Sequence, residues 1–148
     1  MTLKIQRTVE TGAAPAPVFA YLSDFTTTTE WDPGSISTTR VEGDGGVGTV
    51  YENVSEFNGR RTELRYTVLE HQPPSKVVLR GENKTLTALD TMQIEPHGTG
   101  TRVTYTAEFT FKGLLQVIQP VLGLALASSF KKLGDEAEQG MHAALERL

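Results

Sequence analysis

The feature that most constrains the fold is a long stretch of two-residue alternation, which a single long helical segment follows. Between residues 36 and 111, apolar and polar residues alternate, and turn signals such as Asn58-Gly59 and Pro73-Pro74 divide the stretch. Such alternation indicates half-buried strands, and Asn-Gly favours a type I′ hairpin. The pattern predicts strands at residues 36–42, 47–56, 60–71, 76–81, 85–95 and 101–111, and a first strand at residues 2–10.

Side-chain pairing across the Asn58-Gly59 turn supports a hairpin with one definite register. If Phe57 faces Arg60, residues of opposite charge meet on one side of the hairpin. Aromatic, aliphatic and a few polar residues meet on the other side, which we expect to face the core. The predicted pairs are Glu56–Arg61 and Glu52–Arg65 on the charged side, and Tyr51–Tyr66 and Asn53–Leu64 on the inward side.

The last hairpin carries a carboxylate within an inward apolar stripe. Pairing Ile94 with Val103 places Asp90 opposite Ala107. A carboxyl group that is desolvated in this way has a raised pKa and can serve as an acid or a base. Buried charges are usually paired, however. The carboxylate can instead bond to strand termini or pair with Arg7, which lies on the inward face of the first strand.

Between the first two strands the sequence predicts a short helical region. The segment "TGAAPAP" is a turn whose prolines suit the start of a helix, and Val18, Phe19 and Leu22 then share one helical face. The run "FTTTTEWDPG" does not favour a long helix, because threonine is β-branched, but its hydroxyls can bond the local backbone. We expect a short capped turn that directs Phe25 and Trp31 inward.

The C-terminal segment, residues 114–148, returns to a helical period. We expect its helix to bend or to begin at Pro120. The second half is amphipathic, whereas residues 114–127 are apolar on more than one side. Four neighbours would explain that second apolar side: the loops and small helices, an apolar ligand beneath a lid, a partner chain such as a second copy in a homodimer, or a membrane surface.

One long helix and seven strands together predict an α+β fold, in a single domain over residues 1–148. At least one face of an antiparallel sheet must be covered by other parts of the chain. A strongly curved seven-stranded sheet that wraps around one long C-terminal helix satisfies this need, with two short helices between strands 1 and 2. One helix cannot fill such a concavity, so we expect a cavity between the helix and the sheet.

Composition and charge exclude several classes of partner. The net charge of −4 argues against a nucleic-acid partner. The absence of cysteine excludes disulfides and thiolate metal sites, and it agrees with a cytoplasmic location. The N-terminus lacks the pattern of a signal peptide, and the longest apolar run is too short and too interrupted to be an integral membrane segment. The three histidines lie far apart, so we predict no metal and no other cofactor.

Three segments carry a resemblance to a known family: "APAPVFAYLSDFTTTTEWDPG", "LEHQPPSKVVL", and "DTMQIEPHGTGTRVTYTAEFTFKGL" before the long helix. The chain resembles the START/Bet v 1-like superfamily (SRPBCC), within its polyketide cyclase/dehydrase and lipid-transport group. The resemblance covers nearly the whole chain. It implies a helix-grip fold with a hydrophobic cavity beneath the C-terminal helix. It implies no catalytic residue, because the group shares no catalytic motif.

Candidate site residues follow from the inward positions of the strands and from the apolar part of the last helix. Asp90, Arg7 and Tyr66 are the candidates for acid–base catalysis. The inward tyrosines combine an apolar ring with one hydroxyl, which suits a cavity that must orient a ligand. The predicted ligand-binding residues are Trp31, Tyr51, Asn53, Leu64, Tyr66, Leu79, Ala88, Asp90, Met92, Tyr105, Phe109, Val117, Val121 and Leu124.

Two functions from different classes fit this sequence. The first is a module that binds a hydrophobic small molecule, such as a lipid or a polyketide, in the cavity. The second is a polyketide cyclase, aromatase or dehydratase that uses acid–base residues of the same cavity.

Overall fold

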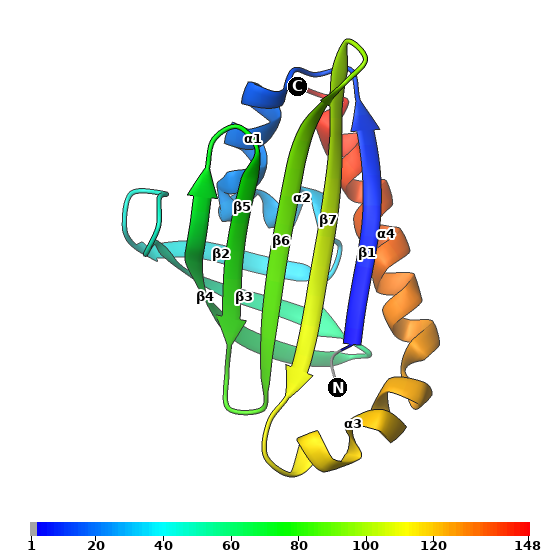
Figure 1. Cartoon of the computed structure of the whole chain (residues 1–148). Coiled ribbons are helices and arrows are strands. Elements are labelled where there is room, and N and C mark those ends of the chain that lie inside the picture. The colour runs from blue at the N-terminus through cyan, green and yellow to red at the C-terminus, as the bar shows by residue number, and fades with distance from the viewer. Residues whose placement is uncertain (1–2) are drawn as a thin grey trace.

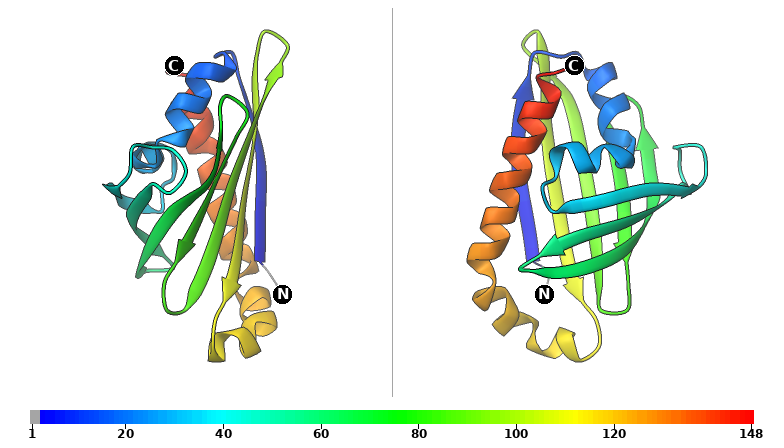
Figure 2. Two further views of the ribbon diagram at one scale, coloured as in Figure 1. Left: turned by 60° about the vertical axis from the view of Figure 1, so that its left-hand side comes forward. Right: turned by 180° about the vertical axis from the view of Figure 1, so that it is seen from behind.

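A computed structural model describes residues 3–148 and confirms the predicted architecture. Seven antiparallel strands form one sheet in the order β1-β7-β6-β5-β4-β3-β2. The sheet is strongly curved, so that β2, β3 and the first part of β4 run crosswise to β1, β6 and β7, and the long helix α4 lies in its concavity (Figures 1 and 2). The strands are β1 (Leu3–Thr11), β2 (Ser35–Glu42), β3 (Val50–Phe57), β4 (Arg60–Gln72), β5 (Lys76–Glu82), β6 (Leu86–His97) and β7 (Gly100–Phe111), and the helices are α1 (Pro15–Ser23), η1 (Phe25–Thr27), α2 (Thr28–Trp31), α3 (Leu114–Ala125) and α4 (Ala127–Leu145).

The predicted strand registers are confirmed at both hairpins. Phe57 pairs with Arg60, and Ile94 pairs with Val103. Asp90 therefore lies opposite Ala107 on the inward face. Most strand boundaries differ from the prediction by one or two residues, and the largest difference is at β3, for which the pattern predicts a start at residue 47 and which begins at Val50. The preceding loop contains Gly43, Gly45 and Gly48 with positive φ, a conformation that a regular strand does not adopt.

The C-terminal segment differs from the expectation of a break at Pro120. Pro120 lies inside α3, which continues to Ala125. The chain instead turns at Leu126, with φ of −101° and ψ of 5°, and α4 begins at the next residue. Figure 1 shows α3 at the end of the molecule away from α1 and the C-terminus. Of the two helices, only α4 crosses the concave face.

Two glycines let α4 approach its neighbours closely. A Cβ at Gly140 would overlap the carbonyl oxygen of Trp31, and a Cβ at Gly134 would lie 2.7 Å from Cγ2 of Ile5. Alanine is the better helix former at such positions. The two glycines therefore lower the helix propensity of α4, but they allow it to pack closely against α2 and β1.

The threonine run forms the expected short capped turns, η1 and α2. The Asp24 side chain accepts from the backbone N–H of Thr26 at 3.1 Å, and the Thr27 hydroxyl donates to the Tyr21 carbonyl at 3.0 Å. The hydroxyls of Thr28 and Thr38 are 2.6 Å apart and join α2 to β2. These bonds fix a segment of low helix propensity.

Candidate functional site

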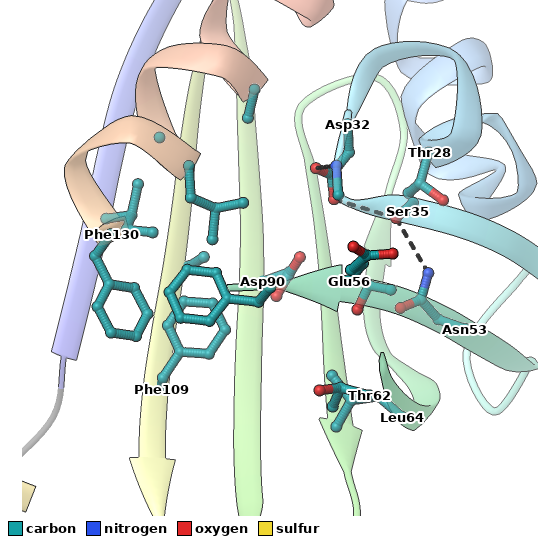
Figure 3. A pocket seen from close by; sticks show the side chains of 18 of the residues that line it. Thr28, Asp32, Ser35, Asn53, Glu56, Thr62, Leu64, Asp90, Phe109 and Phe130 are labelled. Atoms are coloured by element: carbon teal, nitrogen blue, oxygen red, sulfur yellow. Dashed lines mark hydrogen bonds between the residues drawn. The ribbon is translucent and has the colours of Figure 1, made fainter. Parts of the chain in front are cut away.

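The candidate site is a cavity of about 250 Å³ between the sheet and helices α2 and α4 (Figure 3). Ligand pockets measure roughly 300–1,000 Å³, so this cavity is slightly smaller than that range. Aromatic and aliphatic side chains form most of its wall. The lining residues are Ile5, Phe25, Thr28, Trp31, Asp32, Gly34, Ser35, Asn53, Ser55, Glu56, Phe57, Arg60, Thr62, Leu64, Tyr66, Leu86, Asp90, Tyr105, Ala107, Phe109, Phe111, Leu126, Phe130, Leu133, Gly134 and Ala137.

Asp90 is an ionisable group of the cavity wall whose pKa is strongly raised. Its side chain is buried, and Oδ2 accepts a hydrogen bond from the Tyr105 hydroxyl at 3.0 Å. Burial raises the pKa of Asp90 to about 7; the Tyr105 hydrogen bond opposes this rise, and the charge of Asp32 adds to it. The carboxyl group thus changes charge near neutral pH.

Two polar atoms of the cavity wall lack a hydrogen-bond partner among the described residues. They are Oδ1 of Asp90 and Nε1 of Trp31, and both side chains are at least nine-tenths buried. The indole of Trp31 packs edge-on against the ring of Tyr105, with centroids 5.4 Å apart. Buried polar groups are nearly always hydrogen-bonded, so each of these two atoms is available to bond a water molecule or a polar group of a ligand.

Tyr66 and Tyr105 place two phenols in the same part of the cavity. Burial, together with the charges of Asp90 and Asp32, raises the pKa of both hydroxyls well above its ordinary value. The ring of Tyr66 lies directly over Gly81, where a Cβ would approach Cε1 to 2.7 Å. Both phenols therefore remain neutral hydrogen-bonding groups at physiological pH.

A second set of polar side chains on the wall makes its hydrogen bonds within the protein. The Asn53 amide donates to the Thr38 hydroxyl at 2.8 Å and to the Ser35 hydroxyl at 3.1 Å (Figure 3). Asp32 accepts from the Gly34 backbone N–H and the Ser35 hydroxyl, both at 3.1 Å. Burial raises the pKa of Asp32 above its ordinary value, although these hydrogen bonds oppose the rise. This group holds α2 against β2 and β3.

Three phenylalanines lie together on the lower part of the wall. The ring of Phe130 on α4 is 5.0 Å from that of Phe57 and 5.5 Å from that of Phe109. All three are only partly buried. They connect the start of α4 to β3 and to β7, which lie on opposite sides of the curved sheet.

The structure brings half of the predicted ligand-binding residues to this cavity. Leu79, Ala88 and Met92 are completely buried and do not line it, and Tyr51 lines a separate surface hollow. The predicted residues that line the cavity are Trp31, Asn53, Leu64, Tyr66, Asp90, Tyr105 and Phe109.

The suggested pair between Arg7 and Asp90 is wrong. The Arg7 guanidinium forms an ion pair with Asp135 of α4 at 3.0 Å, and it also donates to the Lys131 carbonyl at 3.3 Å. The residue that bonds Asp90 is Tyr105 instead. Arg7 points to the correct face of β1 but toward the outer side of α4, so it does not line the cavity.

Val117, Val121 and Leu124 do not line the cavity either. Their exposed fractions are 78%, 70% and 83%, and they lie on the outer face of α3. The break at Leu126 turns α3 away from the concave face, which the pattern of apolar residues alone does not predict.

The sequence interpretation missed several wall residues. Phe130, Leu133 and Ala137 line the cavity from α4, where they follow the i, i+3, i+7 spacing of one helical face. That spacing could have identified them. Phe57 and Arg60 belong to the β3–β4 turn, and their presence depends on the curvature of the sheet.

Within residues 3–148, no three His, Asp or Glu side chains lie close enough together to hold a metal ion. The same part of the chain contains no helix with the length and apolar character needed to cross a membrane.

Comparison with known proteins identifies the fold. A family model described as "Polyketide cyclase / dehydrase and lipid transport" matches residues 2–147. No curated protein matches the chain in sequence. Three solved structures share the fold, each at low sequence identity. They are the Zhui aromatase/cyclase from Streptomyces sp. R1128 (TM-score 0.82, 12% identity, 99% of this chain and 95% of that chain), a START superfamily protein from Mycobacterium smegmatis (0.68, 14%, 97% and 97%), and Ara h 8.0201 (0.58, 17%, 93% and 98%).

Proposed function

Because the chain belongs to the polyketide cyclase/dehydrase and lipid transport family, with a START/Bet v 1-like fold, we propose that it binds a hydrophobic small molecule in the cavity beneath α4. The mainly apolar wall favours an apolar ligand. The volume of about 250 Å³ suits a compound of one or two rings better than a long acyl chain.

The observation that carries this proposal is the pair of unpartnered atoms, Asp90 Oδ1 and Trp31 Nε1. The indole N–H needs an acceptor. The Asp90 carboxyl needs a donor when ionised and an acceptor when protonated. An oxygen substituent on the ligand, such as a hydroxyl or a carbonyl, meets these needs. We therefore propose an aromatic ligand with its oxygen end toward Asp90 and its rings toward Phe109 and Phe130.

This proposal predicts that the protein distinguishes 2-naphthol from 2-methylnaphthalene, which have nearly the same shape. The buried polar atoms gain a partner only from the hydroxyl, so we expect naphthol to bind about tenfold more tightly. In Asp90→Leu the two affinities should become similar. In Glu56→Gln, a change at an exposed carboxylate of the same wall, the preference should persist. Titration calorimetry measures each affinity.

Two results would count against different parts of this account. Equal affinities in the wild-type protein would contradict the assigned oxygen end but leave a hydrophobic site. No heat of binding and no rise in melting temperature with either compound, or with a wider panel of lipids and polyketides, would contradict the binding function itself.

A second candidate function, a polyketide cyclase or aromatase, is favoured by the raised pKa of Asp90 beside two neutral phenols. In an aldol-type ring closure, a base takes a proton from a carbon between two carbonyls. That carbon then bonds to the carbon of another carbonyl group along the substrate, whose oxygen takes up a proton. Asp90 suits the first proton transfer, because its pKa lies near neutral pH, and Tyr66 suits the second.

If the chain catalyses such a reaction on a linear poly-β-ketone, Asp90→Asn and Tyr66→Phe should each lower kcat by about 100-fold. KM should change by much less, because both variants keep the shape of the cavity. Wild-type turnover in both variants would contradict these two assignments. Their matched control is Tyr21→Phe, which removes a hydroxyl outside the cavity that donates to Glu30.

A further inference from the structure

Helix α3 buries a polar side chain and exposes apolar ones, which is the reverse of the usual arrangement for a helix that faces water. It buries Gln119, which is 2% exposed and whose Oε1 accepts from the Phe111 backbone N–H at 3.2 Å. It exposes Val117, Val121 and Leu124, at the i, i+4, i+7 spacing of a single stripe, and Ile118 beside them is 45% exposed. We call these four residues the α3 stripe.

The sequence around the stripe has a charge pattern that suits an anionic surface. Residues 113–130 contain no charged side chain, in a chain of which 22% is charged. Lys112 precedes this segment, and Lys131 and Lys132 follow it. Segments that lie in a membrane interface combine an apolar face with nearby basic side chains, and the α3 stripe with its flanking lysines shares these two features.

The lysines around the stripe remain accessible. The side chains of Lys131 and Lys132 are 75% and 76% exposed, and their ion pairs with Asp135 and Glu136 are surface pairs that contribute little. Lys4 lies in the same surface hollow as Gly123 of α3 and Lys131. Lys112 is the exception, because it forms an ion pair with Glu82 at 2.9 Å and donates to the carbonyl of Asn83. The exposed Lys84, which follows Asn83, therefore supplies the accessible cation at this end of the stripe.

We propose that the α3 stripe docks on a membrane surface that carries anionic headgroups. The four aliphatic side chains would enter the boundary between headgroups and acyl chains, and the flanking lysines would meet the headgroup phosphates. A second copy of the chain fits less well, because a two-fold contact through the stripe would bring the same lysines together.

The position of α3 is consistent with such a contact. It lies at one end of the molecule, where it contacts β7 and the start of α4 and leaves its outer face free (Figures 1 and 2). Leu126 and Phe130, just after α3, line the cavity. Docking would therefore place this part of the cavity wall next to the lipid, whichever molecule the cavity holds.

Vesicle sedimentation tests the proposal directly with the purified protein. Vesicles of phosphatidylcholine with about 30% phosphatidylglycerol should bind the protein, and binding should weaken in pure phosphatidylcholine and at about 0.5 M salt. Leu124→Asp and Val121→Asp should each lower the partition coefficient at least about tenfold. The control is Val47→Asp, at an exposed valine of the β2–β3 loop, which should bind as the wild type does.

A second pair of variants tests the charged part of the surface. Lys84→Gln and Lys132→Gln should each weaken binding to the anionic vesicles by about fivefold and leave the secondary structure unchanged. Absence of vesicle binding, or equal binding by wild type and Leu124→Asp, would overturn the proposal. A dimer by light scattering that Leu124→Asp converts to a monomer would also overturn it, in favour of a second copy as the occupant.

Discussion

Replacement of Asp90 by asparagine should stabilise the protein, and the gain should grow by about 2–3 kcal/mol between pH 5 and pH 8. Asparagine has nearly the same shape and can still accept the hydrogen bond of Tyr105, but it cannot ionise. The variant therefore avoids the cost of a buried negative charge, which the wild-type protein bears once Asp90 loses its proton.

The direction of this effect follows from the two pKa values of the carboxyl group. In the unfolded chain Asp90 ionises near 3.8, whereas burial holds its pKa at about 7 in the folded protein. Between these values the folded state keeps a proton that the unfolded state has lost, so a rise in pH lowers the stability of the wild type. Above about pH 7 both states are ionised and the loss is complete.

Urea unfolding of the wild type and the variant at both pH values measures this difference. Glu63→Gln, at an exposed carboxylate of β4, is the control and should show no comparable dependence on pH. A constant difference between Asp90→Asn and the wild type would mean that Asp90 ionises normally. It would then have water around it, and the description of Asp90 as a desolvated carboxyl group of the cavity wall would be wrong.

Gly140→Ala should lower the free energy of unfolding by about 2–3 kcal/mol, although alanine favours a helix by about 1 kcal/mol. The new methyl group would overlap the carbonyl oxygen of Trp31, and its carbonyl carbon would be only 2.9 Å away. Backbone atoms cannot rotate aside as a side chain can. Helix α4 must therefore shift away from α2, which changes the distance between Trp31 and the cavity residues of α4.

Gly12→Ala is the matched control, because a Cβ at Gly12 meets no atom within 4 Å. Denaturant unfolding should show a change of less than about 0.5 kcal/mol for Gly12→Ala. If Gly140→Ala proved equally mild, α4 would be free to shift on α2, and the close contact would not position the cavity wall.

The sequence predicts the sheet well because each hairpin carries its own register signal. Glu52, Glu56, Arg61 and Arg65 can pair only if Phe57 faces Arg60, and the Asn58-Gly59 turn requires the same register. Inward positions such as Asp90 follow directly, because side chains alternate along a strand.

The cavity wall was harder to predict because it depends on curvature and on helix direction. Leu79 and Met92 share the inward face with Asp90, and Leu79 is its cross-strand partner, but neighbouring side chains bury both completely and neither lines the cavity. Val121 and Leu124 have the pattern of a lid, but the backbone turn at Leu126 directs them outward. A local residue pattern contains neither the bend of the sheet nor the angle between two successive helices.

The most direct test of the account is a crystal structure of the protein with bound 2-naphthol. We expect the rings near Phe109 and Phe130, beneath α4, with the hydroxyl within hydrogen-bonding distance of Asp90 Oδ1. Naphthol bound only outside this cavity, or rings in the cavity with the hydroxyl turned away from Asp90 and Trp31, would contradict the proposed site.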